Sequence, residues 1–337
     1  MRAMGLLALA AIFLARCQSA TADGPEDAAN KSSGNLNLAA PTLGGMQFWS
    51  DQLFFHQWRI QRNSFTGHYR LLDGQDVRRA WGTFDECRAA LEDIKQREKL
   101  PAMTGKAVIV LHGLGRTRSS MNGIAQFLEK NGSFEALNVS YPSTIADIDN
   151  HAQSLARIIE NLKDVEEIDF VGHSLGNLVV RRYLDAANST AGPDPRIKRM
   201  VMLGPPNNGA QLAEALDHNL VSRELIGVPG RELAENWSKL SARLAVPKFE
   251  FGIIAGGKQN GCGYNPLLSG DNDMVVTVEE TRLAGARDFL CVPVIHTVIM
   301  DDRASQEATL KFLESGYFIA QDKRQPIEPE SKSDGRE

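Results

Sequence analysis

The stretch Val171-Gly172-His173-Ser174-Leu175-Gly176 decides the fold prediction. It follows the short apolar run 168–171, which is typical of a buried strand, and it opens the apolar helical pattern 175–186. A sharp turn from strand to helix holds a serine in a strained backbone conformation with its Oγ exposed, and Cβ atoms at positions 172 and 176 would collide with that turn. The pattern therefore predicts an exposed serine at the carboxyl end of a strand.

The sequence around this turn alternates short apolar runs with longer helical patterns from residue 106 onward. Such alternation is typical of βαβ units and of a parallel sheet covered on both faces. The expected strands are 107–111, 136–140, 168–171, 199–203, 249–254 and 289–294, and the expected helices include 145–162, 175–186 and 305–314. No internal repeat interrupts this order, so we expect one α/β domain.

Gly172-His173-Ser174-Leu175-Gly176 resembles the nucleophile elbow of the α/β-hydrolases, in a spelling common among their lipases. The resemblance covers residues 106–317. It implies an α/β-hydrolase domain over residues 104–320, with a mostly parallel central sheet flanked by helices. It also implies a serine hydrolase that cleaves carboxylic esters, lipid-like or short-chain, with Ser174 as nucleophile and His173 as a structural neighbour.

A serine hydroxyl needs an imidazole to take its proton, and that imidazole needs a carboxylate to fix its tautomer. In this superfamily the order is serine, acid, histidine. His296 directly follows the expected strand 289–294, which favours it as the base. The loop 270–276 resembles the acid loop of several lipases, which aligns Asp273 with the catalytic carboxylate and leaves Asp271 as the alternative acid. A calcium-binding loop is a third interpretation of this acidic run, although it lacks the glycine and glutamate of an EF-hand.

Attack on an ester carbonyl builds negative charge on its oxygen, which two backbone N–H groups must stabilise. Leu175, the residue after the nucleophile, supplies one donor. By resemblance to the His-Gly loops of lipases, Leu114 in His112-Gly113-Leu114-Gly115 supplies the other. For His112 a buried hydrogen-bonding role is favoured over metal ligation, because no second ligand follows at metal spacing. The glycines lack the spacing and the lysine of a phosphate-binding loop.

The turn 204–209 resembles the Thr-Pro-x-x-Gly turn of triacylglycerol lipases, with Gly204 in place of the threonine. The largely helical stretch 210–246 that follows is not needed by the minimal fold. In this fold such insertions commonly form a lid over the acyl pocket, so we expect a lid-like insertion. The alternative is a set of surface helices.

The N-terminus has the charged, apolar and small-residue order of a secretory signal peptide over residues 1–22, which predicts export to the periplasm or the medium. Lipoprotein anchoring at Cys17 is the alternative, disfavoured by Arg16 before the cysteine. A flexible leader is expected over 23–46 and a disordered tail over 321–337.

Residues 47–103 form an N-terminal extension that is expected to pack on the main domain and to end in a helix near 85–98. Its first part carries the aromatic residues Phe48, Trp49, Phe54, Phe55 and Trp58. The alternative interpretation of this cluster is an interfacial helix in peripheral contact with a membrane.

The composition limits the kinds of partner that the protein can bind. The net charge of −5 offers no broad basic surface, which argues against a nucleic-acid partner. The resemblance to lipases and esterases implies a small-molecule ester or lipid as substrate. The hydrolase scheme requires no metal and no organic cofactor.

Beyond the predicted signal peptide, the cysteines are Cys87, Cys262 and Cys291, and a disulfide bridge between the last two is a hypothesis. An acyltransferase with the same triad, or a noncatalytic lipid- or partner-binding protein on this scaffold, remains an alternative function. The sequence specifies no oligomeric state.

Overall fold

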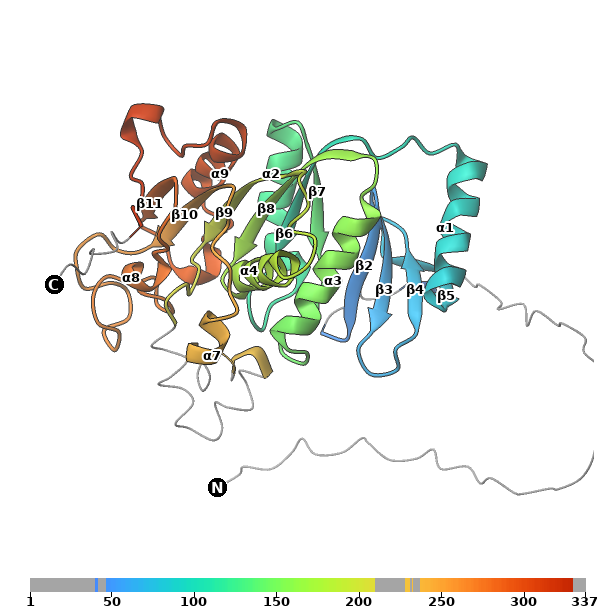
Figure 1. Cartoon of the computed structure of the whole chain (residues 1–337), viewed down its shortest axis with the longest axis horizontal. Coiled ribbons are helices and arrows are strands. Elements are labelled where there is room, and N and C mark those ends of the chain that lie inside the picture. Colours follow the sequence, from blue (N-terminus) through green and yellow to red (C-terminus); the bar gives the residue numbers. More distant parts are fainter. Residues whose placement is uncertain (1–39, 42–46, 210–227, 231, 233–236, 330–337) are drawn as a thin grey trace, which may run out of the picture. The chain divides into compact units, whose positions relative to one another are not determined.

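A computed structural model describes residues 40–41, 47–209, 228–230, 232 and 237–329 of the chain (Figure 1). The predicted signal peptide, Cys17 and nearly all of the predicted leader lie outside the described residues. So does most of the predicted lid-like insertion, of which residues 228–230, 232 and 237–246 are described.

The central sheet has six strands, and every neighbouring pair is parallel. Its order is β11-β10-β9-β8-β6-β7. The strands are β6 (Gly105–Leu111), β7 (Phe134–Val139), β8 (Val165–His173), β9 (Ile197–Leu203), β10 (Glu250–Gly256) and β11 (Asp288–Val292). Each coincides with a strand predicted from the sequence, within a few residues at the ends.

Helices cover both faces of this sheet (Figure 1). The helical elements are η1 (Arg118–Met121), α2 (Asn122–Asn131), α3 (Ile148–Asn161), α4 (Leu175–Asn188), α7 (Trp237–Ser241), α8 (Val278–Thr281), η2 (His296–Val298), α9 (Arg303–Ser315) and η3 (Gln321–Lys323). Along β6, Ile109 packs in one core with α3 and α4, whereas Val108 and Val110 pack in the other with α2 and α9. The sheet is therefore buried on both sides, as expected for parallel strands that read as continuous apolar runs. This is the α/β-hydrolase fold, with the strand-to-helix turn at Ser174 between β8 and α4.

The N-terminal extension forms a second, antiparallel sheet of order β1-β5-β4-β3-β2. Its strands are β1 (Ala40–Pro41), β2 (Trp49–Phe55), β3 (Trp58–Asn63), β4 (Tyr69–Leu72) and β5 (Val77–Gly82), followed by helix α1 (Phe84–Glu98). The helix begins with a capping box between Thr83 and Glu86, close to its predicted start. The interfacial helix considered for the aromatic cluster is wrong, because Phe54 and Phe55 are buried on a strand.

A buried polar network joins this sheet to the central one. The Asp51 N–H donates to the Ser140 carbonyl at 2.9 Å, and the Asp51 carboxylate accepts from the Ser140 N–H at 2.6 Å. The same carboxylate accepts from Gln61 at 2.7 Å and pairs with Arg59. Because Asp51 is fully buried, these partners compensate its desolvation and fix β2 beside the end of β7.

The C-terminal segment departs from the predicted disordered tail. Within 321–337, residues 321–329 are ordered, and the Ile327 N–H donates to the Ala286 carbonyl at 2.9 Å. The Gln325 N–H donates to the Asp288 carboxylate at 2.8 Å. These hydrogen bonds order residues 321–329, although the polar composition of this segment predicts disorder. Residues 330–337 lie outside the described part.

The proposed bridge between Cys262 and Cys291 is absent. Both are free thiols, with Cys262 exposed and Cys291 half-buried, and Cys87 is a free thiol in the core. Burial raises the pKa of Cys87 to about 12, so this thiol is chemically inert. No helix in the described ranges is long and apolar enough to span a membrane.

Candidate active site

Ser174 lies in the turn between β8 and α4 with φ 51° and ψ −119°, a conformation that an L-residue rarely adopts. Such a backbone costs about 1–3 kcal/mol and persists only where the surroundings impose it. The Ser174 N–H donates to the Leu203 carbonyl at 3.0 Å. A Cβ at Gly176 would stand 2.6 Å from the Leu111 carbonyl oxygen. The predicted reason for this glycine, close backbone approach, is confirmed.

Asp273 and His296 form a buried hydrogen-bonded pair. Asp273 Oδ2 lies 2.7 Å from His296 Nδ1, and the His296 backbone N–H donates to the Asp273 carbonyl at 2.8 Å. The other carboxylate oxygen accepts from the N–H groups of Val275 at 3.0 Å and Val276 at 2.8 Å. Asp273 is fully buried and His296 is 6% exposed. The pair is therefore shielded from water, and the carboxylate favours the tautomer that has its proton on Nδ1.

Asp271, the alternative acid, is hydrogen-bonded to backbone groups of its own loop region and not to His296. Its carboxylate accepts from the backbone N–H groups of Lys258 at 2.8 Å, Gln259 at 2.7 Å and Asn272 at 3.0 Å. These bonds fix the loop after β10 and leave the carboxylate without a contact to His296. The geometry thus favours Asp273 as the partner of the imidazole. In the described part of the chain no three His, Cys, Asp or Glu side chains gather as a metal site would require.

Two glycines that the sequence did not mark as functional make room for this pair. Gly204 has φ +50°, and a Cβ there would stand 3.0 Å from His296 Nδ1 and 3.3 Å from Asp273 Oδ2. At Gly256 a Cβ would stand 2.8 Å from the Asp273 Cβ. Glycine at 204, where the similar turn of triacylglycerol lipases has threonine, was the signal in the sequence at that position. The reason for the glycine becomes clear only from the space beside His296.

The loop after β6 lies against the serine. A Cβ at Gly113 would stand 3.1 Å from the Ser174 Cβ. Leu114 is the next residue, half-buried, and Leu175 is the first residue of α4, where a backbone N–H has no intrahelical acceptor. Among the described residues, neither of these two N–H groups has a hydrogen-bond acceptor. Neither backbone donor is used within the described part of the fold.

His173 connects the serine turn to His296. Its ring centroid lies 4.7 Å from that of His296, and His173 Nε2 lies 3.0 Å from the His296 carbonyl oxygen. Burial lowers the pKa of His173 well below its ordinary value, so the ring is neutral and acts as a support. Because Ser174 follows His173 directly in the chain, the serine also lies near His296. Its hydroxyl makes no hydrogen bond with any described residue, a state common before substrate binds.

His112 is a buried stacking residue, in agreement with the favoured interpretation. Its ring is stacked on Tyr141 at 4.1 Å between centroids, and Nδ1 lies 2.9 Å from the Gly113 carbonyl oxygen. The Tyr141 hydroxyl donates to the His112 carbonyl. Burial lowers the pKa of His112 to about 4. Together these contacts fix the start of the loop that carries Leu114.

Comparisons with known proteins find similarity only at a low level. A family model described as a domain of unknown function (DUF7379) matches residues 74–226. No curated protein matches the chain.

Solved structures that are similar to the chain include lipases, esterases and a phospholipase. Lipase BlEst2 of Bacillus licheniformis, in its mature form, is 20% identical with a TM-score of 0.46, and the match covers 64% of this chain and 94% of that one. Phospholipase PlaB of Legionella pneumophila in complex with thio-NAD is 21% identical with a TM-score of 0.43, covering 52% of this chain and 44% of that one. The metagenomic carboxyl esterase MGS0156 is 17% identical with a TM-score of 0.42, covering 57% and 64%. Because the similarity is so low, any statement about activity rests on the geometry described above.

Proposed function

We propose that the chain is a serine hydrolase that cleaves carboxylic esters, of the lipase or esterase kind, through Ser174, His296 and Asp273. The observation that carries this proposal is the buried hydrogen bond between Asp273 and His296, next to a serine held in a strained turn. An Asp–His pair with a purely structural role would not need a strained serine beside it. A strained serine without such a pair would lack a group to accept its proton.

The reaction follows from these positions. His296 Nε2 takes the proton of the Ser174 hydroxyl as Oγ attacks the ester carbonyl carbon, and the Asp273 carboxylate stabilises the imidazolium that forms. The N–H groups of Leu114 and Leu175 stabilise the negative charge on the carbonyl oxygen. The tetrahedral intermediate collapses to an acyl-serine, and His296 gives its proton to the departing alcohol.

Deacylation repeats these steps with water. His296 removes a proton from a water molecule that attacks the acyl carbonyl, and the proton then returns to the Ser174 oxygen as the carboxylic acid leaves. If an alcohol replaces water, the same residues perform acyl transfer.

The test is hydrolysis of p-nitrophenyl esters of increasing acyl length by the protein, by Ser174→Ala and by Ser189→Ala, which removes an exposed hydroxyl at the end of α4. We expect Ser174→Ala to lose about 10⁴-fold or more in kcat while Ser189→Ala stays active. Mass analysis of products with added glycerol separates the free acid from the transferred ester. The proposal fails if no ester is cleaved with or without detergent, or if Ser174→Ala matches the unaltered protein.

A further inference from the structure

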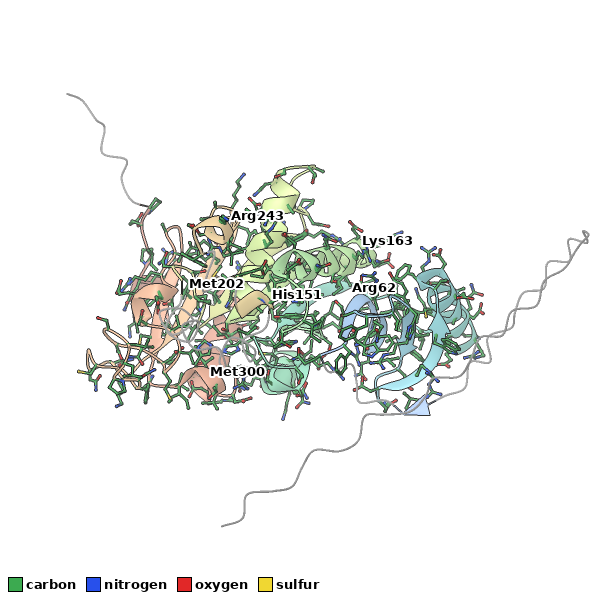
Figure 2. The ribbon with its side chains drawn as sticks, turned by 90° about the horizontal axis from the view of Figure 1, so that it is seen from below. Arg62, His151, Lys163, Met202, Arg243 and Met300 are labelled. Carbon is green, nitrogen blue, oxygen red and sulfur yellow. The ribbon has the colours of Figure 1, made fainter. Side chains whose placement is uncertain are left out.

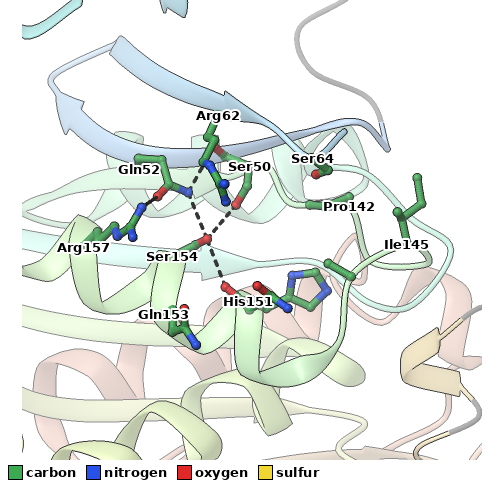
Figure 3. Close-up of a pocket in the computed structure, with 12 residues that line it drawn as sticks. Ser50, Gln52, Arg62, Ser64, Pro142, Ile145, His151, Gln153, Ser154 and Arg157 are labelled. Atoms are coloured by element: carbon green, nitrogen blue, oxygen red, sulfur yellow. Dashed lines mark hydrogen bonds between the residues drawn. The ribbon is translucent and has the colours of Figure 1, made fainter. Parts of the chain in front are cut away.

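A polar cavity lies between the N-terminal sheet and helix α3 (Figure 3). Its volume is about 190 Å³, enough for one small ionic group. Strands β2 and β3 supply one wall and α3 the other, and Figure 2 shows Arg62 and His151 on these two elements. The lining side chains used below are Ser50, Gln52, Arg62, His151, Ser154 and Arg157.

Among the described residues that line it, the cavity carries two positive charges and no negative one. Arg62 and Arg157 line it, and none of its lining residues is an aspartate or glutamate. In the described part of the chain the Arg62 side chain makes no ion pair or hydrogen bond. Among the described residues, the Arg157 side chain donates only to the neutral amide oxygen of Gln52, at 2.9 Å. Two guanidinium groups that share a concave site repel each other, and an anion between them removes that cost.

The floor of the cavity is a network of neutral groups (Figure 3). Ser154 Oγ accepts from Ser50 Oγ at 3.0 Å and from Gln52 Nε2 at 2.9 Å, and it donates to the Asn150 carbonyl at 3.1 Å. His151 lines the same cavity, is 3% exposed, and its Nε2 has no hydrogen-bond partner. A buried polar atom without a partner costs about 1–3 kcal/mol, which a bound polar ligand would offset.

The cavity opens at the ligand-binding edge of the fold. Pro142 and Ile145, which also line it, follow β7, and the loop at Gly113 follows β6, so both lie beyond the carboxyl ends of adjacent parallel strands. The His151 ring lies 4.7 Å from Tyr141, which is stacked on His112. The cavity is therefore separate from Ser174 but close to the loop that carries Leu114.

An exposed aromatic pair adjoins the cavity. Phe48 and Phe65 are 50% and 68% exposed, with ring centroids 5.7 Å apart. Ser64, which lines the cavity, donates its N–H to the Phe48 carbonyl at 2.9 Å. Exposed aromatic rings beside cationic side chains suit the headgroup layer of a membrane.

We propose that this cavity is a binding site for a phosphate-class oxyanion, held by Arg62 and Arg157. Guanidinium groups bind phosphate oxygens in pairs of parallel hydrogen bonds. The serine and amide donors of the floor are used within their own network, so the two arginines supply the bonds to the anion. The phosphate belongs either to a lipid headgroup or to a free phosphate compound, and the aromatic pair favours the headgroup.

The first experiment is calorimetric titration of the full chain with inorganic phosphate. We expect saturable binding that weakens at least tenfold in Arg62→Gln and in Arg157→Gln, since each loses charge-assisted hydrogen bonds. Arg97→Gln, which removes an exposed charge from α1, should bind as the unaltered protein does. Ser174→Ala should also bind equally, so the result is independent of the proposed hydrolase activity. Circular dichroism confirms that each variant is folded.

The second experiment separates the two sources. Vesicles of phosphatidylglycerol are sedimented with the protein, with Phe48→Ser and with the two arginine variants. Sedimentation that depends on Arg62, Arg157 and Phe48 and competes with inorganic phosphate assigns the lipid headgroup; phosphate binding without sedimentation assigns a free phosphate compound. The proposal is overturned if neither probe binds, or if folded Arg62→Gln and Arg157→Gln bind both probes as the unaltered protein does.

Discussion

Replacement of Asp273 by asparagine tests the proposed orientation of the base. Asparagine keeps the carbonyl oxygen that accepts the N–H groups of Val275 and Val276, so the loop should retain its conformation. What changes is the 2.7 Å contact to His296 Nδ1. An amide NH₂ in that place donates to Nδ1 and leaves the imidazole proton on Nε2, where it cannot accept from Ser174.

The expected magnitude follows from the loss of the base. In a triad the wrong tautomer lowers kcat by about 10⁴-fold, which corresponds to about 5 kcal/mol in the activation free energy. The oxyanion donors are unchanged, so a residual rate above that of water should remain and KM should change little.

The matched control is Asp271→Asn, a change of the same chemistry two residues away. Asp271 bonds to three backbone N–H groups but not to His296, so this variant should lose stability without losing kcat. Both variants are assayed on the preferred p-nitrophenyl ester, with thermal unfolding as a check of folding. If Asp273→Asn keeps its kcat within about tenfold of the unaltered enzyme, or if Asp271→Asn loses as much, the assignment of the acid is refuted.

Gly204→Ala should lower kcat at least about tenfold because the added methyl group displaces the Asp273–His296 pair. The control is Gly192→Ala, also at positive φ (+88°) but with no atom within 4 Å, which should keep full kcat. Equal kinetics for both variants would contradict this prediction. Burial lowers the pKa of His112 to about 4 and of His151 to about 3, so their stabilisation is complete above about pH 6.5 and is lost as the pH falls toward those values. Urea unfolding should show a loss of about 2 kcal/mol per histidine at pH 5, and His151→Gln should reduce that loss. Burial raises the pKa of Asp169 to about 7, so its contribution to stability falls as the pH rises from about 4 to about 7. Between pH 5 and pH 8, Asp169→Asn should gain about 3 kcal/mol in unfolding free energy relative to the unaltered protein, and a constant difference would contradict that pKa.

The central sheet was predictable because its strands are buried on both faces. Continuous apolar runs such as 107–111, bounded by turn signals, are typical of buried parallel strands. The turn at Ser174 requires glycine at 172 and 176 because a Cβ at either position would collide with neighbouring atoms. The positions of Asp273 and His296 followed from the order of residues in the superfamily, and the structure places their side chains in contact.

The N-terminal sheet escaped prediction for a physical reason. Its strands bury polar side chains against each other, with Asp51, Arg59 and Gln61 inside β2 and β3. The alternation of apolar and polar residues that marks a strand is therefore missing, and only the partners in space explain why the burial is tolerated. The role of Gly204 was hidden in the same way, since it depends on the space beside His296 and not on a pattern along the chain.

The most direct test of the central claim is covalent labelling of the nucleophile. The protein is incubated at neutral pH with a fluorophosphonate probe, with and without detergent, beside Ser174→Ala, and the modified residue is mapped by mass spectrometry. We expect stoichiometric labelling of Ser174 and no labelling of Ser174→Ala. A folded, ester-cleaving protein that labels at another residue, or equal labelling of Ser174→Ala, would contradict it.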